Sequence, residues 1–157
     1  MKATGQYRRQ AVTTLDIRTG LHQKEDFMRL LARDIERAKA EGHAYTVGAV
    51  VPQHLPGEGV GDIVAAASGC LRELLRDGDL GGRLDDEVLA MGLPFTDSAG
   101  AKVVSYRLQS DLRLKSFHLR TTAWEAGTAT LGEDGETAGE LLAAAIDAAK
   151  TRRRRLG

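Results

Sequence analysis

Two short charged segments carry residue types that could do chemistry. In the first, Arg76 and Asp79 are separated by two residues, and they combine a planar fork of hydrogen-bond donors with a carboxylate acceptor. In the second, Asp85, Asp86 and Glu87 place three carboxylates in a row, and carboxylate oxygens are ligands for divalent cations. Each segment also has a plainer interpretation. The first could be a helix-end cation beside an exposed carboxylate, and the second could be a polar turn. Their interest therefore depends on the elements that position them.

Other reactive residue types show no comparable arrangement. The chain has four histidines, with no mutual spacing typical of metal ligation: His22, His43, His54 and His118. Cys70 is the only cysteine, which excludes an internal disulfide and a cysteine-based zinc site. We expect Cys70 and Trp124 to pack in the core.

Composition predicts one compact domain. Of the 157 residues, 42% are hydrophobic and 28% are charged, which suffices for a core and argues against disorder. Lys plus Arg equals Asp plus Glu at 22 each, so no net charge draws the protein to nucleic acid or anionic membranes. No apolar run approaches the ~18–20 residues of a membrane-spanning helix. We therefore expect a cytoplasmic protein that neither binds nucleic acid nor inserts into membranes.

Apolar periodicity predicts four helices and four strands. In chain order they are a helix over Glu25–Gly42, a strand over Ala44–Val51, a helix over Gly61–Arg76, hairpin strands over Leu80–Leu84 and Val88–Leu93, a helix capped by Asp97 with the apolar face Val103, Val104, Leu108 and Leu112, a strand from Phe117 to Thr130, and a helix over Thr137–Lys150. This order predicts an α+β, ferredoxin-like β-α-β-β-α-β core with an antiparallel sheet, helices packed on one face and extra terminal helices. Residues 1–12 and the basic residues 152–157 are expected to be tails.

Four short motifs follow one another along the chain. The first resembles the D-x-L-T-G-L-x-N-R-x-x-F opening of the GGDEF domains, the diguanylate cyclase family: Asp16-Ile17-Arg18-Thr19-Gly20-Leu21-His22-Gln23-Lys24-Glu25-Asp26-Phe27. The others resemble the family's G-D at the second helix, its R-x-G-G-D-E-F hairpin with one residue missing, and its C-terminal A-K: Gly61-Asp62, Arg83-Leu84-Asp85-Asp86-Glu87-Val88 and Ala149-Lys150. We call residues 83–88 the signature hairpin. The resemblance covers about Thr13 to Arg155, places a GGDEF-like domain over 13–151, and implies a nucleotide-cyclase palm.

The resemblance also implies a chemistry that we do not expect here. Active members condense two GTP molecules into cyclic di-GMP and need metal-binding carboxylates at the end of the first strand and in the hairpin. Where the family has Asp-x-Asp at the strand end, this chain has Val50–Pro52. Leu84 and Asp85 replace the paired glycines, which puts side chains where backbone should approach phosphate. Asp86 and Glu87 remain, but without the strand carboxylate we expect neither catalysis nor catalytic magnesium.

The family's second nucleotide site is a product-binding inhibitory site, an R-x-x-D upstream of the hairpin. Arg76 and Asp79 occupy that position. Guanine offers O6 and N7 to an arginine fork and its N1–H and N2–H donors to a carboxylate, so the resemblance implies that this pair binds cyclic di-GMP. Arg107 falls near a further arginine that joins the family's site from a neighbouring face or subunit, and it is equally compatible with a solvated helix position.

The resemblance therefore implies an inactive cyclic di-GMP receptor in bacterial second-messenger signalling, binding through Arg76, Asp79 and Arg107. Cyclic di-GMP would bridge two surfaces or two copies of the chain, as in a ligand-dependent homodimer. This would alter the contact with a protein partner. The alternative is a nucleotide-free scaffold for protein–protein interaction. A third hypothesis, a residual GTP site, predicts magnesium-dependent GTP binding that requires Asp86.

Overall fold

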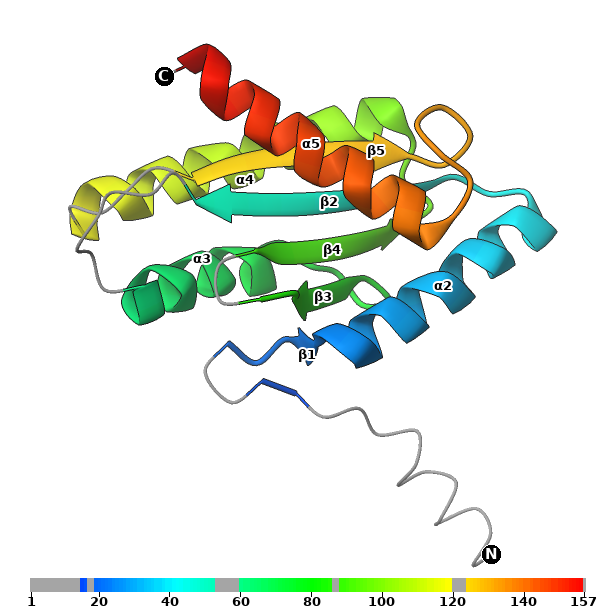
Figure 1. Ribbon diagram of the computed structural model, residues 1–157, viewed down its shortest axis with the longest axis horizontal. Coiled ribbons are helices and arrows are strands. Elements are labelled where there is room, and N and C mark those ends of the chain that lie inside the picture. The colour runs from blue at the N-terminus through cyan, green and yellow to red at the C-terminus, as the bar shows by residue number, and fades with distance from the viewer. Residues whose placement is uncertain (1–14, 17–18, 53–59, 86–87, 120–123, 157) are drawn as a thin grey trace, which may run out of the picture.

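The structure is a computed structural model, and it describes residues 15–16, 19–52, 60–85, 88–119 and 124–156. The elements follow the expected order, with one short strand added at the start (Figure 1). In chain order they are β1 (His22–Gln23), α2 (Lys24–Glu41), β2 (Tyr45–Pro52), α3 (Val60–Leu74), β3 (Leu80–Arg83), β4 (Leu89–Pro94), α4 (Ser98–Leu119), β5 (Trp124–Thr130) and α5 (Ala138–Leu156). None of these described helices combines the length and hydrophobicity needed to cross a membrane.

The five strands form one sheet in the order β1-β3-β4-β2-β5. From β3 to β5, every neighbouring pair is antiparallel, so the predicted α+β, ferredoxin-like core is confirmed. The exception is β1, which pairs parallel to β3 with His22 opposite Gly82. The sequence did not predict β1 because two residues are too few to show an alternating pattern.

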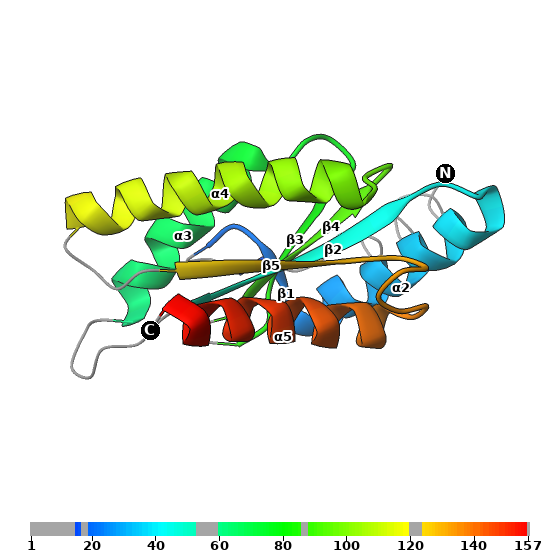
Figure 2. The same cartoon turned by 90° about the horizontal axis from the view of Figure 1, so that it is seen from above.

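The sheet separates two hydrophobic cores. Helices α3 and α4 cover one face, and α2 and α5 cover the other (Figure 2). Trp124 and Cys70 are buried in the first core, as expected, and Phe27 is buried in the second. The two helices of the ferredoxin-like core, α3 and α4, therefore share one face as predicted, whereas the cover of the other face by the extra helices α2 and α5 was not predicted. Strand β2 explains this second cover, because Val50 faces the first core and Val47 the second, and a strand that is apolar on both faces needs cover on both.

Helix α4 differs from its prediction at two places. It continues to Leu119, so Phe117–Leu119 are helical and the following strand begins only at Trp124. The alternation that indicated a strand at Phe117 is too short to exclude a continuing helix. Val103 was assigned to the buried face, yet it is 69% exposed, whereas Leu108 and Leu112 are buried. The buried stripe includes Ala101, and at 100° per residue Val103 lies on the opposite side of the helix.

Helix α5 extends beyond its predicted end at Lys150 and continues to Leu156. Arginine is a good helix former, and the segment contains no glycine or proline before Gly157 that would end the helix,. The helix lies directly on β5 at Gly127, where an added Cβ would overlap the backbone of Ala145 and Ala149.

Side chains cover the outer edge of β5, the last strand of the sheet. The amide of Gln109 donates a hydrogen bond to the Trp124 carbonyl and accepts one from Ala126 N at 3.0 Å. At the other end of the strand, Thr130 N donates to Asp134 Oδ2 at 2.8 Å. Gln109 is buried, so these bonds satisfy an amide that would otherwise be costly to bury.

Candidate functional site

Arg76 and Asp79 close a tight turn between α3 and β3. The Asp79 carboxylate accepts hydrogen bonds from the backbone N–H of Arg76 at 2.8 Å, from its Nε at 3.2 Å and from its Nη2 at 3.4 Å. Gly78 supports the turn with a φ of +92°, which glycine adopts without steric cost. The Arg76 side chain is 61% exposed, whereas that of Asp79 is only 3% exposed. In this conformation Asp79 orients the guanidinium and faces away from solvent.

Further acceptors fix the same guanidinium from the segment after β4. Arg76 Nη2 donates to the Pro94 carbonyl at 3.3 Å and to Thr96 Oγ1 at 3.2 Å. Among the described residues, none accepts a hydrogen bond from Nη1. Two N–H donors on a charged, exposed group therefore point away from the turn, and such donors suit phosphate or carbonyl oxygens.

Phe95 lies between Pro94 and Thr96, which both accept hydrogen bonds from Arg76. Phe95 has a φ of +56° and is 73% exposed. The ring stacks on the imidazole of His43, with centroids 4.0 Å apart and planes inclined by 26°. Phe95 was not predicted as a site residue, and His43 was noted only as a histidine without the spacing typical of metal ligation. The available signal was an aromatic residue directly after the strand-ending Pro94.

An open hollow of about 370 Å³ lies between the Arg76 turn and the start of α4. Arg76, Phe95 and Asp97 contribute its polar and aromatic groups. The remaining wall consists of Ala44, Thr96, Gly100, Val103 and Val104. The volume falls within the ~300–1,000 Å³ typical of small-molecule sites. Asp97 caps α4 as expected, because its Oδ1 accepts from Gly100 N at 2.9 Å.

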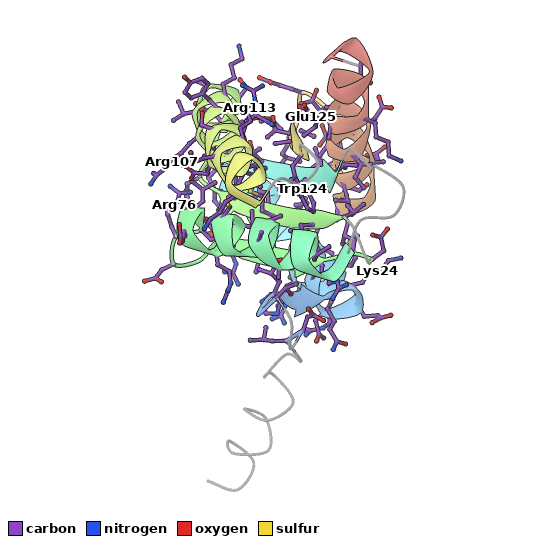
Figure 3. All side chains as sticks on the ribbon, turned by 90° about the vertical axis from the view of Figure 1, so that its left-hand side faces the viewer. Lys24, Arg76, Arg107, Arg113, Trp124 and Glu125 are labelled. Atoms are coloured by element: carbon purple, nitrogen blue, oxygen red, sulfur yellow. The ribbon has the colours of Figure 1, made fainter. Side chains whose placement is uncertain are left out.

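Arg107 lies outside this hollow. It is an exposed residue of α4, one turn beyond the lining residues Val103 and Val104. Figure 3 shows Arg76 and Arg107 on the same flank of the molecule, formed by α3 and α4. The structure thus brings Arg76 and Asp79 into direct contact and leaves Arg107 on the neighbouring surface.

The described part of the signature hairpin is held by its own hydrogen bonds. Leu84 N donates to the Val88 carbonyl at 2.9 Å, and Val88 N donates to Asp85 Oδ1 at 2.8 Å. Arg83 Nε donates to the Asp85 carbonyl at 3.1 Å. Asp85, at a position where the family has glycine, therefore stabilises the turn. Asp86 and Glu87 lie outside the described residues.

The end of β2 runs beside this hairpin, with Val50 opposite Leu89. Val50 and Val51 are buried apolar residues, so the strand end offers no carboxylate toward the hairpin. Within the described ranges, no group of three or more histidine, cysteine or acidic side chains could hold a metal ion. Cys70 is also chemically quiet, because burial raises the pKa of its thiol.

Neither a protein-family model nor a curated protein matches the chain, but solved structures match over nearly its whole length. The GGDEF domain of FimX from Pseudomonas aeruginosa has a TM-score of 0.77 at 17% identity, over 92% of this chain and 96% of that one. The GGDEF domain of DgcB from Caulobacter crescentus, in complex with c-di-GMP, has a TM-score of 0.74 at 18% identity, over 90% and 88%. The diguanylate cyclase SiaD from Pseudomonas aeruginosa, in complex with its activator SiaC, has a TM-score of 0.78 at 18% identity, over 98% and 66%.

Proposed function

The chain has the fold of GGDEF domains, and we propose that it is a catalytically inactive domain of this fold that binds cyclic di-GMP at the Arg76 turn. One observation carries the proposal. The guanidinium of Arg76 is oriented by hydrogen bonds to Asp79, Pro94 and Thr96 and keeps Nη1 directed away from the turn beside an open hollow. A donor group that is oriented before binding loses less entropy when a ligand arrives.

The three predicted ligand residues have different parts in this proposal. Arg76 donates to the phosphate or to the O6 and N7 acceptors of guanine. Asp79 holds Arg76 in place, since its carboxylate already accepts from that residue. Arg107 completes the site from the adjacent surface of α4 or from a second copy, which makes a ligand-dependent homodimer one expected outcome. Cyclic di-GMP would then act as a ligand that changes contact with a protein partner.

Inactivity is the second half of the proposal. Divalent cations bound by carboxylates would have to neutralise the triphosphates of two GTP molecules, and residues 50–52 supply no carboxylate at the strand end. We therefore expect neither magnesium-dependent GTP turnover nor tight magnesium binding. Incubation with GTP and magnesium, followed by chromatography of the nucleotides, should give no cyclic di-GMP.

Isothermal titration with cyclic di-GMP tests the receptor role. We expect binding at micromolar affinity or tighter, about −8 kcal/mol, which Arg76→Ala abolishes. Arg113→Ala is the matched control, because Arg113 is another exposed arginine, on α4, and lies outside the hollow. Equal melting temperatures of the two variants would exclude unfolding as the cause. No binding to the unmodified chain, by titration and by equilibrium dialysis, would contradict the proposal.

A scaffold for protein contacts is the second candidate, favoured by one observation. Three large apolar side chains of α4 are exposed: Val103 at 69%, Tyr106 at 76% and Leu114 at 59%. In that case a partner would bind α4 equally well with and without nucleotide, and Arg76→Ala would leave the interaction unchanged.

A further inference from the structure

The conformation of Phe95 is unfavourable for folding alone. A φ of +56° lies in the left-handed region, which is costly for a bulky side chain. Burial does not compensate, because Phe95 is 73% exposed. Strained residues persist where surrounding contacts hold them, and they are concentrated at ligand sites.

The surrounding contacts hold Phe95 in a defined position. Its backbone N–H donates to the Ala44 carbonyl at 2.8 Å, and its ring rests on His43. Its neighbours Pro94 and Thr96 both accept hydrogen bonds from Arg76. The hydrogen bonds of Arg76 to residues 94 and 96 therefore fix the guanidinium beside the backbone that carries the aromatic ring.

The ring of Phe95 borders two hollows. One is the hollow of about 370 Å³ that also contains Arg76 and Asp97. The other, of about 230 Å³, contains His43 and Tyr45. The second hollow is also lined by an arginine, Arg37, but only the first adds the apolar side chains of Val103 and Val104. A hollow between apolar side chains and an aromatic ring can accept a nucleobase, since every base can stack on an aromatic side chain.

We propose that the hollow beside Arg76 takes a purine base, which stacks on Phe95 and is read by Asp97. This inference rests on the proposed function and states where a guanine of the ligand lies. Asp97 uses Oδ1 to cap α4, and none of the described residues donates to its Oδ2. That oxygen suits the N1–H and N2–H donors of guanine, whereas adenine has an acceptor at N1 and no amino group at C2. The Asp79 carboxylate does not bind the base, because it already accepts hydrogen bonds from Arg76 and is almost fully buried.

Phe95→Gly separates the role in binding from the role in folding. Glycine adopts a positive φ without strain, so we expect the variant to retain its melting temperature while its affinity for cyclic di-GMP falls at least tenfold. Tyr106→Ala is the matched control, because Tyr106 is 76% exposed on α4 and lies outside the hollow. In NMR spectra of the unmodified chain, the ring protons of Phe95 should move upfield on addition of ligand.

Asp97→Asn tests the reading of the base. Asparagine is also a good helix cap, but its amide group replaces the free carboxylate oxygen. We expect the preference for cyclic di-GMP over cyclic di-AMP to fall at least tenfold. If cyclic di-GMP binds the Phe95→Gly variant as tightly as the unmodified chain, the stacking inference is wrong and the receptor function stands. If it does not bind the unmodified chain, both are wrong.

Discussion

Arg83 and Asp16 form an ion pair across 67 residues of the chain, with 3.2 Å between Nη1 and Oδ2. Asp16 also accepts hydrogen bonds from the side chain of Thr19 at 2.7 Å and from its backbone N–H at 3.0 Å. The pair joins the segment before β1 to the signature hairpin. Its side chains are 15% and 22% exposed, so solvent screens the interaction only in part.

Asp16→Asn should lower the free energy of unfolding by about 1 kcal/mol at pH 7. Burial raises the pKa of Asp16, but hydrogen bonds from Thr19 and Arg83 outweigh burial and hold that pKa below its ordinary value of 3.8. A lowered pKa contributes stability above the unfolded value, and this contribution is lost as the pH falls through the folded value. Urea titrations should therefore show the unmodified chain and the variant converging below pH 4. An equal difference in unfolding free energy between the two proteins at pH 7 and below pH 4 would contradict this account.

Gly127→Ala should destabilise the protein by about 1–3 kcal/mol. The added methyl group would overlap the backbone of Ala145 and Ala149, which cannot rotate away as a side chain could. Gly69→Ala is the matched control in α3, since its Cβ meets no atom within 4 Å, and it should stabilise the helix by about 1 kcal/mol. Thermal unfolding of the two variants should thus move in opposite directions.

Tyr45→Phe should cost about 1 kcal/mol. The Tyr45 hydroxyl donates to Asp34 Oδ2 at 2.8 Å, and burial raises the pKa of Tyr45, so the phenol remains a neutral donor. The same oxygen lies 2.5 Å from the position of a Cβ added at Gly92. Gly92→Ala should therefore be less damaging in the Tyr45→Phe background than alone. A double-mutant cycle in urea measures the coupling, and strictly additive effects would show that the contact is unimportant.

Asp79→Ala should weaken binding of cyclic di-GMP about tenfold, because the guanidinium of Arg76 loses the carboxylate that orients it,. Asp79→Asn should be milder, since its amide oxygen still accepts from the Arg76 backbone. The Nε–H signal of Arg76 should broaden in the alanine variant before any ligand is added. Equal losses in the two variants, with a sharp Nε–H signal in both, would indicate that Asp79 contacts the ligand itself.

Apolar periodicity predicted the core elements well because helices and strands of this length repeat their pattern several times. Leu108 and Leu112 are buried as expected. The failures lie where the pattern is short or ambiguous. Strand β1 has two residues, and the Phe117–Leu119 alternation is compatible with a helix.

The candidate site was predictable in position but not in geometry. Sequence order placed Arg76 and Asp79 at a helix-to-strand junction, which the structure confirms. The hydrogen bonds between Asp79 and Arg76 depend on the turn at Gly78. The position of the Phe95 ring depends on its stack with His43, which is distant in the sequence. No local pattern encodes a contact between segments that meet only after the sheet has formed.

The side-chain amide of Gln109 limits how this protein can assemble. It occupies the positions at Trp124 and Ala126 where the backbone of a sixth strand would bond,. A peptide or a second copy would have to displace a buried side chain before it could pair with β5 at these residues. Strand exchange and fibril growth from this edge are therefore disfavoured as long as Gln109 stays in place.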